Sequence, residues 1–298
     1  MIKKVGFVGI GAMGAPMAKN LHRKGFDVVV CDVSKSALEP FENDGVKTTT
    51  TAADCSDTDA VIVMVATLDQ IRHVVFGPKG LLSGETRPRY VVVMGTVLPA
   101  AIHALAEELL KQGVRLIDAP VSGGIVKAID GTLTIIVGSE PADCEAVRPM
   151  FDAMGSAVFH CGDVGSGQVT KIINNVVCIA NMMISAEAYR IGLDNGLKLE
   201  NFIPVMEMGT GRNFFTRNVD DAPEAYGAWA PTKKDFDAIQ SIIRKDIGLG
   251  REIGSRSGAL PTIDALHDVL ANVDESSFET WRRVIEAHSR DTATAAVG

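Results

Sequence analysis

Near its start, the chain of 298 residues reads Gly9-Ile10-Gly11-Ala12-Met13-Gly14. An apolar segment, residues 3–9, leads into these glycines, and helix-favouring residues dominate the segment 15–24 that follows them. The first segment is typical of a buried parallel strand and the second of a helix. A second apolar segment, residues 26–31, ends directly before Asp32. Glycines with the spacing G-x-G-x-x-G between a strand and a helix, followed by an acid after the next strand, predict a dinucleotide-binding fold of the Rossmann type.

Each part of this motif has a physical role in holding a dinucleotide. Gly9 permits the tight turn, Gly11 lets the backbone approach a pyrophosphate, and Gly14 lets the helix pack closely on the sheet. The phosphates would lie at the positive N-terminus of the helix. A glycine-rich turn in another α/β fold is the alternative. The predicted cofactor contacts are Gly9, Ile10, Gly11, Ala12, Met13, Gly14 and Asp32.

Asp32 bears on the choice of dinucleotide. Its carboxylate would accept hydrogen bonds from the ribose hydroxyls and would repel a 2′-phosphate, so NAD is preferred over NADP. The nearby Lys35 could pair with that phosphate, which keeps NADP as the alternative. A turn residue or helix cap is the other interpretation of Asp32.

Apolar segments and helix-length segments alternate along the first half of the chain. Further strands are expected at 60–66, 90–94, 115–119, 132–138 and 158–161, and a helix at 99–112. This alternation predicts βαβ units and a doubly wound parallel sheet. Strand patterns fade after residue 167, and residues 168–196 predict one long apolar helix. We therefore expect a dinucleotide-binding Rossmann domain over 1–164. An all-α domain over 165–298 would begin with a long linking helix and serve substrate binding and oligomerisation.

The composition excludes several classes of protein. Hydrophobic residues make up 46% and charged residues 22% of the chain, close to globular averages. A net charge of −8 argues against a nucleic-acid surface. The longest apolar stretch is interrupted by asparagines, which argues against a membrane partner. Five cysteines without a C-x-x-C pair favour a reducing compartment, hence the cytoplasm. The histidines show no metal-ligand spacing, so no metal is expected.

Four ordered motifs resemble those of the β-hydroxyacid dehydrogenase family, which includes 3-hydroxyisobutyrate dehydrogenase and tartronate semialdehyde reductase. The first extends the glycine motif to Leu21. The second is Asp118-Ala-Pro-Val-Ser-Gly-Gly124, the third runs from Gly165 to Asn175, and the fourth is Lys245-Asp246-Ile247. The resemblance covers roughly residues 3–270. It implies an NAD(P)-dependent oxidoreductase acting on a 3-hydroxy acid and its semialdehyde or keto form.

Two segments depart from the family pattern. Where many members read Asp-x-Ser-Thr, this chain reads Val93-Met-Gly-Thr96, and the retained Thr96 is expected on the nicotinamide side. Where many read Met-Leu-Pro, this chain reads Met64-Val65-Ala66, so backbone contacts of Val65 and Ala66 with the cofactor are expected. Both departures resemble the branch that acts on sugar acids such as threonate.

The candidate catalytic pair is Lys171 and Asn175. Four residues apart on a helix, they share one face. Apolar neighbours partly desolvate the lysine, which disfavours its charged form and suits proton transfer near neutral pH. The resemblance implies that Lys171 is the general acid/base and that Asn175 orients the substrate. From composition alone, a lysine reaching from a buried helix towards water is the alternative.

Substrate contacts are expected in three further places. The successive glycines of Ser122-Gly123-Gly124 can gather backbone N–H groups around a carboxylate, although an ordinary turn reads the same way. By resemblance, Lys245 lies near substrate or nicotinamide; a solvated helix lysine is the alternative. Arg212, in the segment 210–215, could clamp a second acidic group, and a plain loop is the alternative.

The expected activity is reversible hydride transfer between a nicotinamide and a small 3-hydroxy acid. An imine reductase and a non-catalytic NAD-binding protein are the alternatives. Lys171 argues against the first, since that class usually has aspartate or tyrosine there, and the Lys171, Asn175 and Ser122 set argues against the second. Because the long helix is too apolar for solvent, a homodimer or homotetramer packed through the helical domain is also expected.

Overall fold

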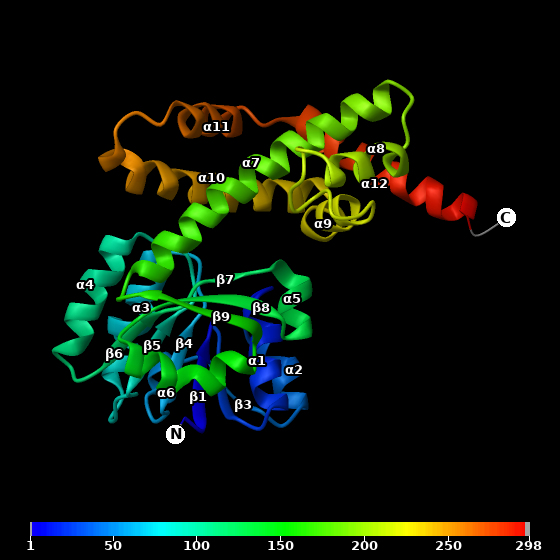
Figure 1. Ribbon diagram of the computed structural model, residues 1–298. Coiled ribbons are helices and arrows are strands. Elements are labelled where there is room, and N and C mark those ends of the chain that lie inside the picture. The colour runs from blue at the N-terminus through cyan, green and yellow to red at the C-terminus, as the bar shows by residue number, and fades with distance from the viewer. Residues whose placement is uncertain (1, 296–298) are drawn as a thin grey trace. The chain divides into compact units, whose positions relative to one another are not determined.

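The computed structural model describes residues 2–295, with side chains other than those of Arg256 and residues 289–295. The chain divides into two compact units, residues 1–171 and 172–298. The division falls inside one helix, α7 (Ser166–Asp194), whose first turns belong to the first unit. Figure 1 labels the elements along the chain.

The first unit is a sheet with helices on both faces (Figure 1). Its strands are β1 (Lys4–Val8), β2 (Asp27–Cys31), β3 (Lys47–Thr49), β4 (Ala60–Val63), β5 (Tyr90–Val93), β6 (Arg115–Asp118), β7 (Val121–Ser122), β8 (Leu133–Gly138) and β9 (Gly155–Gly162). Its helices before α7 are α1 (Gly14–Arg23), α2 (Lys35–Asn43), α3 (Leu68–Phe76), α4 (Pro99–Leu110), α5 (Gly124–Asp130) and α6 (Pro141–Asp152).

The strand order is β3-β2-β1-β4-β5-β6-β8-β7, with β9 paired to β8. The first six strands are parallel in the order 3-2-1-4-5-6, which is the Rossmann arrangement and confirms the predicted fold.

The sheet is mixed rather than parallel throughout, because β8 runs antiparallel to β6 and β7. A parallel neighbour needs a crossover of a dozen or more residues. Only residues 123–132 separate β7 from β8, so the chain reverses direction instead.

Alternating strand residues build two apolar cores, one on each face of the sheet. Phe7 and Ile62 face the side covered by α1, α2, α5 and α6. Val8 and Val63 face the side covered by α3 and α4. Strands buried on both faces explain the unbroken apolar segments in the sequence. The sheet is thereby fixed rigidly, and its strand ends can carry a site.

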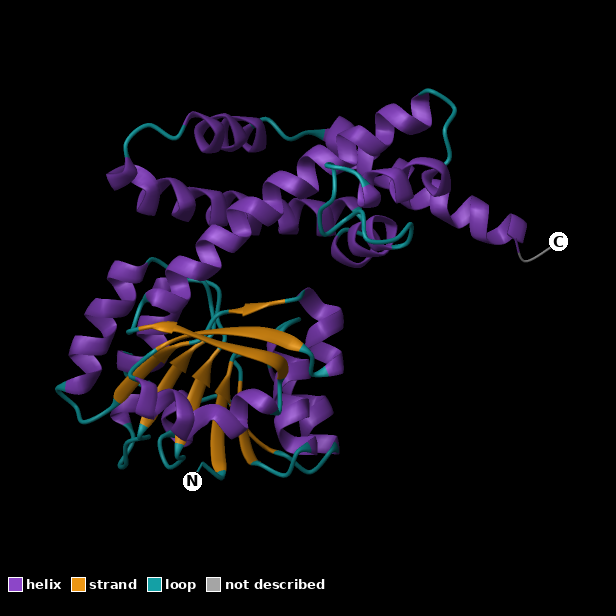
Figure 2. Cartoon of the chain, viewed as in Figure 1, coloured by secondary structure: helices purple, strands orange, loops and turns teal. Residues whose placement is uncertain are grey.

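The second unit is helical, with no strand among its described residues (Figure 2). After α7 come α8 (Leu199–Met208), α9 (Asp221–Trp229), α10 (Lys233–Gly254), α11 (Pro261–Ala271) and α12 (Glu275–Ala295). Aromatic rings fill its core: Tyr226 stacks on Trp281 with centroids 4.7 Å apart, and Phe236 meets Trp281 edge-on.

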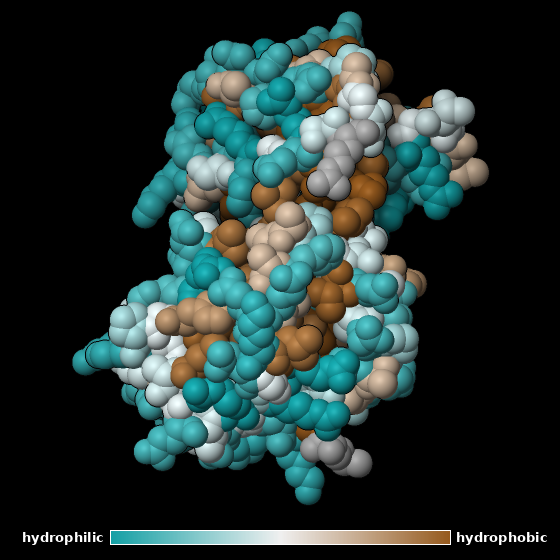
Figure 3. Space-filling view, turned by 90° about the vertical axis from the view of Figure 1, so that its left-hand side faces the viewer, coloured by the Kyte–Doolittle hydropathy of each residue, from teal (hydrophilic) through white to brown (hydrophobic). Residues whose placement is uncertain are grey.

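Helix α7 confirms the predicted long helix. By length and composition it could cross a membrane, a test that core helices of soluble proteins also pass. One side of its second half packs in the core of the second unit through Ile179, Met182 and Tyr189. The other side leaves Ile184 and Ile191 more than half exposed. Hydrophobic side chains also reach the surface in Figure 3, where they form brown areas among hydrophilic ones.

Candidate active site

The predicted cofactor residues of the first unit follow the carboxyl ends of neighbouring parallel strands. Gly9 comes after β1, Asp32 after β2, Met64 after β4 and Met94 after β5. In open α/β sheets, ligands bind outside these strand ends. The fold therefore brings segments far apart in the sequence to one edge of the sheet.

The glycine loop fits a dinucleotide. Gly9 has a φ of +92°, and a Cβ there would lie 2.4 Å from the carbonyl oxygen of Met64, so no other residue fits. A Cβ on Gly11 would meet nothing within 4 Å, which leaves open space for a pyrophosphate beside the backbone. The loop then enters α1, whose N-terminus is the positive end of the helix dipole and favours an anion.

Asp32 is held in place by the glycine loop. Its Oδ2 accepts a hydrogen bond of 2.9 Å from the Ile10 amide, and its Oδ1 accepts one of 2.9 Å from the Ser34 amide. These two bonds fix the plane of the carboxylate, while each oxygen keeps a further lone pair for a ribose hydroxyl. The carboxylate is thus held in one orientation next to the glycine loop, with acceptor capacity left over.

The segments after β4 and β5 touch each other. A Cβ on Gly95 would lie 2.3 Å from the carbonyl oxygen of Val65, so the two backbones pass in direct contact. Ala66 is exposed and Thr96 half-buried. This contact places the expected cofactor residues Val65 and Thr96 on adjoining segments.

Ser122 ends β7, and the two glycines that follow it both have positive φ, +134° at Gly123 and +70° at Gly124. Helix α5 begins at Gly124. The loop is therefore a turn built by glycines, and its backbone can present N–H groups to an anion.

Lys171 lies in the second turn of α7 and is buried, with 9% of its surface exposed. The start of the helix is held by Asp118, the last residue of β6, and by Gln168. Burial of a lysine beside the carboxyl ends of the strands suits a proton-transfer role.

Asn175 follows Lys171 on the same face of α7. Its Nδ2 donates a hydrogen bond of 2.6 Å to Oδ2 of Asp246 on α10. Asp246 is 5% exposed, and the Nζ of the neighbouring Lys245 lies 3.4 Å from its Oδ1. Within the second unit, the third and fourth motifs of the sequence therefore meet at this carboxylate.

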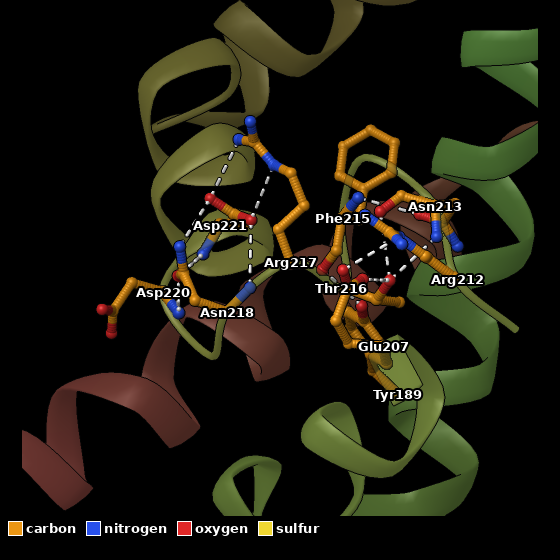
Figure 4. Close-up of polar contacts among 10 residues, drawn as sticks. All are labelled: Tyr189, Glu207, Arg212, Asn213, Phe215, Thr216, Arg217, Asn218, Asp220 and Asp221. Atoms are coloured by element: carbon orange, nitrogen blue, oxygen red, sulfur yellow. Dashed lines mark hydrogen bonds and ion pairs between the residues drawn. The ribbon is translucent and has the colours of Figure 1, made fainter. Parts of the chain in front are cut away.

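Arg212 lies in the segment between α8 and α9 (Figure 4). Its Nε is 3.0 Å from Glu207 Oε1, and its side chain is 71% exposed. Thr216 also donates to Glu207, over 2.9 Å, and Tyr189 donates to the carbonyl of Phe215 over 2.6 Å. These contacts tie the segment to its own unit, and Glu207 already engages the guanidinium that was expected to clamp a substrate group.

Three buried polar residues inside the motifs were missed as functional candidates. Asp118, Gln168 and Asp246 all lie inside motifs that the sequence displays, and all three are buried. For Asp118 and Gln168 the available signal was a polar residue among apolar ones, because a buried polar side chain must have a partner. The hydrogen-bond partners of Gln168 and Asp246 lie 50 or more residues away along the chain, so they could not be identified from the sequence.

Among the residues that the structure describes, no group of three His, Cys, Asp or Glu side chains could hold a metal ion.

Two family profiles cover most of the chain. The profile described as the NAD binding domain of 6-phosphogluconate dehydrogenase matches residues 4–162. The profile described as NAD-binding of NADP-dependent 3-hydroxyisobutyrate dehydrogenase matches residues 165–281.

Curated relatives agree with the profiles. An NAD-dependent L-serine dehydrogenase of Pseudomonas aeruginosa is 33% identical, and the match covers 89% of this chain and 90% of the relative. The human mitochondrial 3-hydroxyisobutyrate dehydrogenase is 32% identical over 83% of this chain and 74% of its own.

Solved structures share the fold. The 3-hydroxyisobutyrate dehydrogenase of Mycobacterium tuberculosis, solved with L-serine, has a TM-score of 0.75 at 26% identity and covers 91% of this chain and 93% of its own. An imine reductase of Myxococcus stipitatus has a TM-score of 0.61 at 19% identity, and the match covers 96% of this chain and 100% of the reductase. At this identity the likeness shows the fold alone. The glycine loop, the buried lysine and these matches together show that the chain belongs to the β-hydroxyacid dehydrogenase family of NAD-dependent oxidoreductases.

Proposed function

We propose that this protein catalyses the reversible oxidation of a small 3-hydroxy acid, of the 3-hydroxyisobutyrate or sugar-acid kind, to its semialdehyde or keto form. The observation that carries the proposal is the buried Lys171 on α7, followed by Asn175 on the same helix face. When bound, the nicotinamide takes or returns the hydride. The side chains and backbone of the protein bind and orient the reactants and transfer the proton.

Lys171 is the general acid/base of this proposal. In the oxidative direction its neutral amine accepts the proton of the substrate hydroxyl at Nζ. In the reverse direction its ammonium returns a proton to the forming alcohol oxygen. Asn175 orients the substrate, with its own amide held by Asp246.

Substrate and cofactor contacts are proposed for the remaining residues. The Ser122 hydroxyl and the backbone of Gly123 and Gly124 would hold the substrate carboxylate. Lys245 would lie near substrate or nicotinamide. The cofactor contacts are those of Gly9–Gly14, Asp32, Val65, Ala66 and Thr96. Arg212 is the weakest member of the set, because Glu207 already engages it.

Domain roles, assembly and location complete the proposal. Residues 1–164 form the dinucleotide-binding domain, and residues 165–298 serve substrate binding and oligomerisation. The exposed Ile173, Val177, Ile184 and Ile191 form an apolar stripe on α7 that favours a homodimer or homotetramer. All five cysteines are thiols, which fits the cytoplasm.

The test is an absorbance assay of NADH formation with purified protein and a panel of acids: 3-hydroxyisobutyrate, L-serine, glycerate and threonate. We expect turnover with at least one 3-hydroxy acid and a higher kcat/KM with NAD than with NADP. Cyclic imines with NADPH form the competing arm. Imine reduction without hydroxy-acid oxidation, or cofactor binding without any turnover, would refute the proposal in favour of one of its two alternatives.

A further inference from the structure

The buried carboxylate of Asp118 holds the first turn of α7. Its Oδ1 accepts a hydrogen bond of 2.6 Å from the Gly165 amide, and its Oδ2 accepts one of 2.8 Å from the Gln168 amide. Asp118 is fully buried. Both N–H groups belong to the helix start, where the peptide dipoles also favour a negative charge. Asp118 therefore fixes α7 to the end of β6.

The fit around this carboxylate is close. A Cβ added to Gly138 of β8 would lie 2.4 Å from Asp118 Oδ1. A Cβ added to Gly167 of α7 would lie 2.6 Å from the carbonyl oxygen of Ile136 and 2.8 Å from Asp118 Oδ2. The first turn of α7 thus lies in direct contact with β8 and with the Asp118 carboxylate.

Gln168 makes a second attachment with its side chain. Its Nε2 donates a hydrogen bond of 2.9 Å to the carbonyl of Gly95, and its Oε1 accepts one of 3.0 Å from the amide of Val97. These two backbone groups flank Thr96. Gln168 is fully buried, so both bonds are shielded from water.

Lys171 lies three residues after Gln168, about 4.5 Å further along the helix axis and on the same side of the helix. The segment from Asp118 to Ser122 leads directly into the predicted carboxylate-binding loop. Asp118 and Gln168 therefore join three segments of the first unit: the turn that carries Lys171, the 95–97 segment and the start of the 119–124 loop.

We propose that Asp118 and Gln168 are positioning residues that set the placement of Lys171 relative to Thr96 and the Ser122 loop. The proposal rests on the proposed function, since it assigns these residues to the geometry of that reaction. Hydrogen bonds constrain direction as well as distance, whereas an apolar side chain of equal volume would leave α7 able to rotate or slide. A displacement of 1 Å at a reacting group can cost about 100-fold in rate.

The first test compares Gln168→Met with Tyr90→Phe. Met keeps the volume of Gln and removes both side-chain hydrogen bonds. Tyr90→Phe removes the buried bond of 3.3 Å from the Tyr90 hydroxyl to Asp143, at the opposite end of β5. We expect Gln168→Met to lower kcat by about 10- to 100-fold with substrate KM and NADH affinity changed by less than about threefold. Tyr90→Phe should lower Tm while it keeps kcat. The proposal would be overturned if kcat fell in proportion to the loss of Tm, and to the same degree, in both variants.

Gln168→Glu supplies the rescue experiment. A protonated Glu can donate to the Gly95 carbonyl and accept from the Val97 amide, as Gln does, but an ionised Glu can only accept. The kcat of Gln168→Glu relative to the parent should therefore rise as the pH falls, whereas that of Gln168→Met should stay flat. A ratio that does not change with pH would count against a positioning role.

Hydrogen exchange followed by NMR gives a readout that does not depend on turnover. Asp118→Asn should speed exchange at the Val97 amide, which Asp118 does not touch, because loosening α7 withdraws Gln168 from it. Unchanged exchange at Val97 would show that the two attachments are independent and would overturn the proposal. If the parent protein had no dehydrogenase activity, only the proposed function would be refuted. The exchange measurement would still show whether Asp118 and Gln168 act together on the start of α7.

Discussion

The side-chain amide of Asn175 on α7 donates to the carboxylate of Asp246 on α10, with 2.6 Å between Nδ2 and Oδ2. The bond is charge-assisted and its acceptor is buried, so it ranks among the stronger hydrogen bonds of the second unit. The bond directs the amide nitrogen of Asn175 towards α10 and thereby fixes the orientation of the side chain.

Asp246→Asn should disorder this amide. The neutral side chain keeps the size of Asp but loses a charged acceptor, so Asn175 can flip its oxygen and nitrogen. We expect kcat/KM for the hydroxy acid to fall by about tenfold or more, while NADH binding stays close to that of the parent. Steady-state kinetics and NADH fluorescence titration measure the two effects. Asp264→Asn, at the exposed partner of Arg251, is the control; an equal loss in both variants would contradict the assignment.

Lys171→Ala should remove the proton acceptor. We expect kcat to drop by about 100-fold or more, the usual scale of general acid–base catalysis, with little change in NADH affinity. The measurement is turnover across pH 6–10. Lys111→Ala, at an exposed lysine beyond α4, should leave kcat unchanged. An unchanged kcat in Lys171→Ala would remove this residue from the mechanism.

Asp32→Ala should change the choice of cofactor. Loss of the carboxylate removes the acceptor for ribose hydroxyls and the repulsion of a 2′-phosphate, so NAD should bind more weakly and the preference over NADP should shrink. Titration with both reduced cofactors tests this, and Asp44→Ala, at an exposed carboxylate after α2, is the control. Tighter NADP than NAD binding by the parent would contradict the choice of NAD.

Asp118 gives a pH-dependent contribution to stability. Desolvation by burial raises its pKa to about 6 from an ordinary value of 3.8, against the opposing effect of the Gly165 and Gln168 amides. Between these two values the folded state holds more protons than the unfolded state. This group therefore stabilises the fold most at low pH and loses about 3 kcal/mol of that contribution as the pH rises through about 6.

Asp118→Asn removes this titration. The free energy of unfolding of the parent, minus that of the variant, should accordingly decrease by about 2 kcal/mol between pH 4 and pH 7. Urea unfolding followed by circular dichroism measures both proteins, and a difference that is independent of pH would contradict the shifted pKa.

The apolar stripe on α7 predicts association. Light scattering after size exclusion should show at least a dimer, and the double variant Ile184→Glu, Ile191→Glu should lower the assembly state, because both side chains are more than 60% exposed in the single chain. Leu110→Glu, at a comparably exposed position on α4, should leave the assembly state unchanged. A stable monomeric parent would refute the proposed assembly.

Long, regular elements could be predicted from the sequence, and short or irregular ones could not. The buried strands and α7 carry continuous apolar signals. Strand β3 has three residues and β7 only two, too few for a pattern to repeat. Helices α2 and α6 contain Pro40 and Pro149, which oppose a helical prediction.

By itself, the sequence determined the Rossmann start, the candidate lysine and the likeness to one enzyme family, because these depend on residues close together along the chain. The tertiary structure alone decided the reversal of β8, the pairing of Arg212 with Glu207 and the partners of Asp118, Gln168 and Asn175. Most of these contacts join residues that are 40 or more positions apart. Such pairings are selected by burial, because a polar group that has lost water must find whichever partner the folded chain brings within reach.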